Sequence, residues 1–273
     1  MINLRFIFFV YCLISISFSY ASSPLYLELA DSADNYIKRE KWIEAERCII
    51  KALRLEPANF SNALLFSNLG LVQLSKVKFD DSLESFRLGL SISPKSTILL
   101  NNHAKVLMLK NDKENALLDL NLSLSIDSIQ EWPRQMRGFI NYDNKDFIAA
   151  KKDFETLLKA FPENQYGYFG LGLIYEIQEE KDLAEENYEK ALDIEFNEDF
   201  FSHYILLIIK ENKYSKAAEL IRNAITQYPE IAELYIWRGY LHKLNYRNDE
   251  AQADKKTAIN KGADINLVNS YIP

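Results

Sequence analysis

The sequence repeats itself at intervals of 34 residues. Such a period indicates an array of similar units, because each unit can bury its apolar surface only by packing against its neighbours. Ala33 opens the series, and Ile205 stands at one place where a small residue is expected. The other members are small residues in register: Gly70, Ala104, Gly138, Gly172 and Gly239.

A second set of positions follows the same period. Each unit has a small residue, then a larger one four positions later, then a mostly small one three positions further on. Offsets of four and seven place all three on one face of a helix. The first positions are Ala45, Ser82, Ala116, Ala150, Ala184, Ala217 and Ala251; the second are Ile49, Phe86, Leu120, Phe154, Tyr188, Ile221 and the exception Lys255; the third are Ala52, Gly89, Ser123, Leu157, Ala191, Ala224 and Ala258.

Prolines and polar turns mark the ends of the expected helices. A proline stops one helix and can begin the next. The whole chain has only 8 glycines and 7 prolines, few for a protein built from many tight turns between strands. We therefore expect two helices per unit, joined by a polar turn such as Lys38-Arg39-Glu40-Lys41. The unit ends are Pro57, Pro94, Pro162 and Pro229, with Ser128, Phe196 and Ala263 in the other units.

This spacing resembles the tetratricopeptide repeat (TPR) family, whose first helix carries W-x2-L-G-x2-Y and whose second carries A-x3-F, then alanine and proline. The resemblance covers about residues 26–263. It implies an all-α fold, a right-handed superhelical solenoid of about seven helix-turn-helix hairpins. The matching residues are Phe169-Gly170-Leu171-Gly172-Leu173-Ile174-Tyr175, Ala184 to Tyr188 and Ala191-Leu192 in one unit, and Trp42 to Ala45, Ile49, Ala52 and Pro57 in the first.

The predicted organisation has three parts: a secretory signal over residues 1–21, a solenoid over 22–263 and a capping tail over 264–273. No linker rich in proline, glycine or serine interrupts the array, so one continuous solenoid is expected rather than two domains. Ile205 in place of a small residue predicts a wider sixth hairpin, and Lys255 gives the last unit a polar outer face. The predicted units are about 26–59, 63–96, 97–130, 131–164, 165–197, 198–231 and 232–263.

The first 21 residues have the pattern of a secretory signal. Arg5 precedes an apolar run from Phe6 to Phe18, and Ser19-Tyr20-Ala21 offers a cleavage site after Ala21. The apolar run is shorter than the roughly 20 residues that span a bilayer, although an uncleaved anchor remains the alternative. We expect an exported protein, periplasmic or extracellular, and favour a bacterial source from the short signal and the content of Ile, Asn, Lys and Tyr. The processed chain keeps one cysteine, Cys48, which we expect to be buried in a helix.

The net charge of −7 argues against nucleic acid as a partner. Nonspecific binding to nucleic acid requires a basic surface that releases counterions. The acidity is therefore interpreted as ordinary solubility, with a basic partner as the alternative. We expect a protein or peptide partner, no small-molecule substrate, and contact with a membrane only through partners or an uncleaved signal.

The family resemblance implies a concave face, lined by the first helices, that holds extended or helical peptides. The early units place polar side chains there, and the later ones place rings, which are enriched at protein interfaces. The alternatives are that single rings pack into neighbouring hairpins and that the asparagines are only solvated. A clamp for acidic peptide termini is not expected, because the lysines and arginine it needs are missing around Asn68. The candidate binding residues are Asn68, Asn102, Trp132, Phe139, Tyr142, Tyr166, Phe169, His203, Trp237 and Tyr240.

The sequence offers no recognisable catalytic centre. His103, His203 and His242 are too far apart in sequence for a metal-ligand motif. HExxH, a phosphate-binding glycine loop and GxSxG are all absent from the sequence. We therefore predict no catalytic residues, no metal site and no cofactor, and a non-catalytic scaffold that binds a polypeptide. The alternatives are a structural subunit of a cell-envelope assembly that uses its convex face or ends, and a hydrolytic or carbohydrate-active enzyme.

Overall fold

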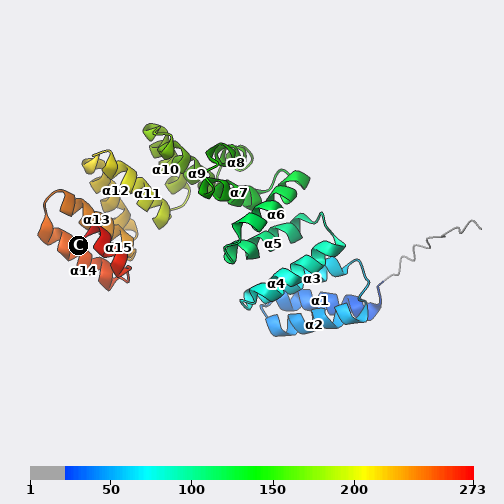
Figure 1. Ribbon diagram of the computed structural model, residues 1–273. Helices are drawn as coiled ribbons and strands as arrows, with labels where there is room; N and C mark the ends of the chain where they lie inside the picture. The colour runs from blue at the N-terminus through cyan, green and yellow to red at the C-terminus, as the bar shows by residue number, and fades with distance from the viewer. Residues whose placement is uncertain (1–21) are drawn as a thin grey trace, which may run out of the picture. The chain divides into compact units, whose positions relative to one another are not determined.

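The computed structural model describes residues 22–273, which form helices and no strands in that range (Figure 1). This confirms the all-α prediction, whereas the predicted secretory signal lies outside the described residues. The helices are α1 (Pro24–Lys38), α2 (Trp42–Leu55), α3 (Asn62–Ser75), α4 (Phe79–Ile92), α5 (Thr97–Leu109), α6 (Lys113–Ile126), α7 (Glu131–Asp143), α8 (Phe147–Ala160), α9 (Gln165–Ile177), α10 (Lys181–Ile194), α11 (Glu198–Lys210), α12 (Tyr214–Gln227), α13 (Ala232–Leu244), α14 (Asn248–Asn260) and α15 (Ile265–Tyr271).

The helices group into two compact units, of which the first ends at Pro94 and the second runs from Lys95 to Pro273. The organisation as one continuous solenoid stays a prediction. No change of composition marks the boundary, since Pro94 occupies the same place in its unit as Pro57 and Pro229. Nothing in the repeat pattern could therefore have located it.

Consecutive helices pair into hairpins whose turns share one backbone feature. A residue with positive φ stands between the two helices of every pair from α1/α2 to α13/α14. This left-handed conformation reverses the chain within a few residues, and it is strained for a β-branched side chain. The seven residues are Glu40, Val77, Asn111, Lys145, Glu179, Asn212 and Tyr246.

Small residues let the two helices of a hairpin approach closely. A Cβ atom added at Gly70 would lie 2.5 Å from Cε1 of Phe86, and one added at Gly172 would lie 2.5 Å from Cε1 of Tyr188. Both rings are fully buried. Glycine on the first helix is thus matched by a ring on the second, as the period of 34 residues predicts. Cys48 is also buried, as expected.

The sixth hairpin packs less closely than the others, as Ile205 predicted. Helices α11 and α12 contact each other less extensively than the two helices of any other described hairpin. Ile205 and Ile221 are both fully buried, so two branched aliphatic side chains replace the pair of a glycine and a ring. The Cβ and branches of Ile205 hold the second helix at a greater distance.

In the last hairpin, a residue from the tail fills the space that a large side chain of the second helix fills in most other hairpins. Lys255 stands where other units place a large apolar side chain, which would leave the space over Gly239 unfilled. The side chain of Ile272 occupies this space, with Cδ1 2.4 Å from where a Cβ of Gly239 would be. Val268 of α15 and Ile272 are 0% and 1% exposed. The tail therefore covers the last hairpin with apolar side chains.

Candidate protein-binding face

The candidate binding residues lie on first helices. Asn68 belongs to α3, in the first compact unit, and the other nine belong to the second. Asn102 lies on α5 and, like Asn68, is partly exposed. The remaining eight are rings of alternate helices: Trp132, Phe139 and Tyr142 on α7, Tyr166 and Phe169 on α9, His203 on α11, and Trp237 and Tyr240 on α13.

Five rings form a continuous series of contacts across α7, α9 and α11. The ring of Phe169 stacks on that of Phe200 with centroids 3.9 Å apart, and it meets the edge of His203 at 5.3 Å. Tyr166 contacts Phe200 at 5.4 Å and Phe139 at 6.5 Å, both in edge-to-face geometry. Such geometries are favourable beyond the area they bury. We call Phe139, Tyr166, Phe169, Phe200 and His203 the aromatic face.

Burial divides the candidate rings into two groups. Phe169 is 8% exposed and Trp237 is 3% exposed, so these two rings pack inside the protein and leave little surface for a partner. Tyr166 is 36% exposed and His203 is also exposed. Trp132, Phe139, Tyr142 and Tyr240 are partly exposed. Tyr166 and His203 are therefore the rings most available to a ligand.

The tail covers the rings of α13. Tyr271 meets Trp237 at 4.7 Å and Tyr240 at 5.1 Å, and its backbone carbonyl accepts a hydrogen bond from Lys243 Nζ at 3.2 Å. The indole Nε1 of Trp237 donates to Ser202 Oγ at 2.9 Å. Both functions of the Trp237 side chain, the ring surface and the N–H group, thus have partners within the protein.

Sequence reasoning missed Phe200 and Tyr271. Phe200 precedes His203 by three positions, a spacing that places both on one side of α11 and that could have revealed it. Tyr271 lies outside the repeat, and no periodic position predicts where the tail packs.

Neighbouring acidic groups raise the pKa of one side chain on α11 and one on α7. The pKa of Glu198 is raised by burial and by the neighbouring charges of Glu233 and Asp199. The pKa of Tyr142 is raised by burial and by the charges of Glu176 and Asp143. Burial is the larger cause of both shifts, and Asp143 is paired with Lys113 Nζ at 2.6 Å.

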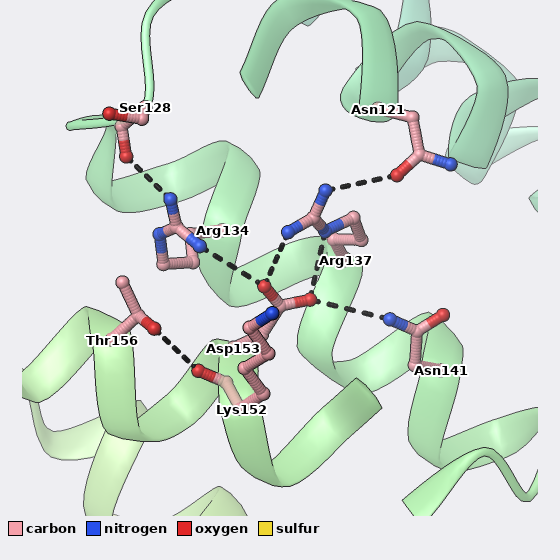
Figure 2. Close-up of polar contacts among 8 residues, drawn as sticks. All are labelled: Asn121, Ser128, Arg134, Arg137, Asn141, Lys152, Asp153 and Thr156. Atoms are coloured by element: carbon pink, nitrogen blue, oxygen red, sulfur yellow. Dashed lines mark hydrogen bonds and ion pairs between the residues drawn. The ribbon is translucent and has the colours of Figure 1, made fainter. Parts of the chain in front are cut away.

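A buried ion-pair network holds α7 in place (Figure 2). The carboxylate of Asp153 on α8 accepts hydrogen bonds from Arg137 Nε at 2.8 Å and Nη2 at 2.6 Å, and from Arg134 Nη1 at 3.2 Å. Arg137 Nη1 also donates to Asn121 Oδ1 on α6 at 3.0 Å. The network joins three consecutive helices, and thereby fixes the orientation of the helix that carries Phe139.

The same pair of positions recurs in other hairpins. An arginine or a histidine stands one residue before the small position of the first helix, and an aspartate stands one residue before the large position of the second. His103 Nδ1 lies 2.6 Å from Asp119 Oδ2, and Arg238 Nη2 donates to Asp254 Oδ1 at 2.5 Å. Each pair joins the two helices of one hairpin. The spacing of 16 residues between the partners could have revealed these pairs in the sequence.

Residues 22–273 hold no group of three or more His, Cys, Asp or Glu side chains placed to bind a metal ion. Within the same range, no helix has both the length and the apolar character needed to cross a membrane. The most strongly shifted tyrosine is Tyr188, whose pKa is raised by burial and by Glu176, whose Oε2 accepts its hydroxyl hydrogen bond at 3.0 Å. It is a core residue under Gly172 rather than an accessible acid.

Comparison with known proteins identifies the family. The model described as "Tetratricopeptide repeat" matches residues 141–197, which run from the end of α7 to the start of α11. This segment carries the tetratricopeptide repeat, and the fold of the described residues is that of solved TPR proteins. The human relative Tetratricopeptide repeat protein 6 is 24% identical over 167 residues, 61% of this chain and 31% of the relative. The chain therefore spans less than a third of the length of that curated relative.

Solved TPR structures share the fold. A tetratricopeptide repeat protein from Parabacteroides merdae has a TM-score of 0.72 at 23% identity, with 92% of this chain and 98% of that one covered. PilW, described as a widely conserved type IV pilus biogenesis factor, has a TM-score of 0.63 at 18% identity, with 76% and 95% covered. At this level of identity the similarity establishes a TPR solenoid and leaves the partner open.

Proposed function

We propose that this TPR protein is an exported, non-catalytic scaffold that binds a polypeptide through the aromatic face. TPR proteins generally serve as scaffolds for protein–protein interaction. The observation that supports the site is the series of ring contacts from Phe139 to His203, of which Tyr166 and His203 remain exposed. Rings that are already held by their neighbours lose little entropy on binding, so they suit a protein interface.

The test is a pull-down from envelope extract with residues 22–273, followed by mass spectrometry. The variant is Tyr166→Ala with His203→Ala, because both side chains are exposed and their loss leaves the core intact. The matched control is Tyr246→Ala, which removes a tyrosine that is 91% exposed and lies in the turn between α13 and α14. A partner that is lost with the double variant and kept with the control supports the proposal.

The alternative is a structural subunit that contacts an assembly through second helices. Ile148 on α8 is 87% exposed, the most exposed of the isoleucines among residues 22–273, and one similar structure is a type IV pilus biogenesis factor. Ile148→Asp removes this apolar contact without touching the aromatic face. Loss of the partner with Ile148→Asp, and its retention with the Tyr166 and His203 double variant, would replace the first proposal by this one.

We further propose that the protein is exported and cleaved after Ala21. This site is supported by Ser22 and Ser23, which are hydrogen-bonded to the turn that follows α2 and so belong to the folded part of the chain. The Ser23 backbone N–H donates to Glu56 Oε1 at 2.7 Å, and Asn59 Nδ2 donates to Ser22 Oγ at 2.8 Å. The intact mass of protein recovered from a periplasmic fraction tests the site. A mass that begins at Ser22 supports it, and a mass that includes Met1 supports an anchor.

A further inference from the structure

A pocket lies between α10, α11 and α12, and none of the residues of the aromatic face lines it. It has a volume of about 210 Å³. It adjoins the sixth hairpin, whose helices α11 and α12 pack less closely than those of the other described hairpins. The lining residues used below are Glu189, Asp193, Phe196, Phe201, Tyr204, Ala224 and Tyr228.

A second departure from the repeat pattern forms the wall of this pocket. Phe196 occupies the unit-end position that is proline in four other units. Its ring stacks on Tyr228 with centroids 4.3 Å apart and an interplanar angle of 22°, and it contacts Phe201 at 5.5 Å. Phe196 and Tyr228 are partly exposed, whereas Phe201 and Tyr204 are buried. An aromatic ligand could therefore pack against rings already fixed by their neighbours.

The volume of the pocket is sufficient for a single ring system. A dry apolar cavity of about 150 Å³ binds benzene, and sites for drug-sized molecules start at about 300 Å³. A pocket of about 210 Å³ can therefore hold one phenol or indole group, with the rest of the ligand outside it.

The charge at the rim of the pocket favours one sign of charge on the ligand. Glu189 is already engaged, because Oε1 accepts from Tyr204 Oη at 2.5 Å and from Lys216 Nζ at 2.8 Å. Asp193 is exposed, and among residues 22–273 no cation lies within ion-pair distance of its carboxylate. The carboxylate of Asp193 thus gives the rim a net negative charge, which complements a lysine or arginine next to the inserted ring.

We propose that this pocket binds an aromatic side chain of a polypeptide partner that carries a positive charge beside that residue. The site is separate from the aromatic face, so a partner could use either one. It gives the second helices α10 and α12 a binding role, whereas the aromatic face involves only first helices.

The test uses three short peptides and amide chemical shifts of residues 22–273. Acetyl-Lys-Trp-Lys-amide has both features, acetyl-Lys-Ala-Lys-amide lacks the ring, and acetyl-Glu-Trp-Glu-amide reverses the charge. The expected result is saturable shifts in α10, α11 and α12 with the first peptide, at least fivefold weaker binding of the acidic peptide, and no saturation with the alanine peptide. Equal affinities for all three peptides, or shifts confined to the surroundings of Tyr166 and His203, would overturn the proposal.

Two variants separate the shape of the pocket from its charge. Ala224→Leu fills the pocket from α12 and should abolish binding of the tryptophan peptide. Asp193→Asn changes only an exposed side chain, so it keeps the fold; it should lower the preference for the basic peptide at least threefold. The matched control is Asp182→Asn, an exposed aspartate of α10 outside the lining, which should change nothing. Should Ala224→Leu not fold, Asp193→Asn still decides: unchanged preference refutes the proposed role of charge.

Discussion

Replacing Ile272 by alanine should destabilise the second compact unit by about 3 kcal/mol. The side chain is 1% exposed and fills the space over Gly239 that Lys255 does not fill. Alanine removes three carbon atoms, worth about 2.4 kcal/mol at about 0.8 kcal/mol for each buried methylene. The cavity left over Gly239 adds to this loss, because the rigid helices relax only in part.

Urea unfolding and hydrogen exchange of residues 22–273 measure this effect together. The chain has two compact units and need not unfold in one transition, so exchange of peptides from α13 and α14 localises the loss. Ile265→Ala, at the start of helix α15 that precedes Ile272 and 57% exposed, should cost less than about 0.5 kcal/mol and serves as the control.

A rescue variant tests whether the side chains at positions 255 and 272 fill the same space over Gly239. Lys255→Phe restores the large residue of the repeat, and in the Ile272→Ala background it should recover at least about 1 kcal/mol. In the unchanged protein the same ring competes with Ile272 for one space, so it should stabilise little or destabilise. Equal effects in both backgrounds would refute the idea that the two side chains share a site.

Three further changes test other parts of the structure. Val77→Asn should stabilise the first unit by about 1 kcal/mol, because a β-branched residue is strained at φ 58°, and the reciprocal Asn111→Val should destabilise; urea midpoints measure both. Asp153→Ala should cost about 3 kcal/mol in the same assay, since it leaves the buried Arg134 guanidinium without its carboxylate. Glu198→Gln should stabilise the folded protein at pH 7. The pKa of Glu198 is raised in the folded state, so ionisation of this carboxyl destabilises the fold as the pH rises from its ordinary pKa through the raised value. The gain should vanish near about pH 3.5, where the carboxyl is protonated in both states.

The repeat pattern predicted the core well because the core is periodic. A glycine on one helix requires a large side chain at a fixed offset on the next, so Gly172 and Tyr188 could be paired from spacing alone. The wider sixth hairpin also followed from one residue, Ile205. Each of these inferences depends only on contacts inside one hairpin, which the sequence encodes locally.

The binding surface was harder to predict because exposure depends on what packs over each residue. Trp237 and Tyr166 both lie on first helices and looked equivalent in the sequence. Trp237 is covered by Tyr271 from the tail, whereas Tyr166 stays partly open. The tail has no repeat partner, so no spacing rule places it.

Departures from the repeat concentrate in the last hairpins of the second unit, and they have opposite consequences. Lys255 removes an apolar side chain, and Ile272 from the tail replaces it, so the last hairpin keeps a filled core. Ile205 widens the sixth hairpin, and the pocket beside it stays open to solvent at Phe196 and Asp193. A packing defect that served no purpose could be closed by one substitution, for instance a larger residue at Ala224. The space over Gly239 is filled, whereas the pocket lined by rings between α10 and α12 stays open. We therefore expect this pocket to be kept open for a ligand rather than closed for stability.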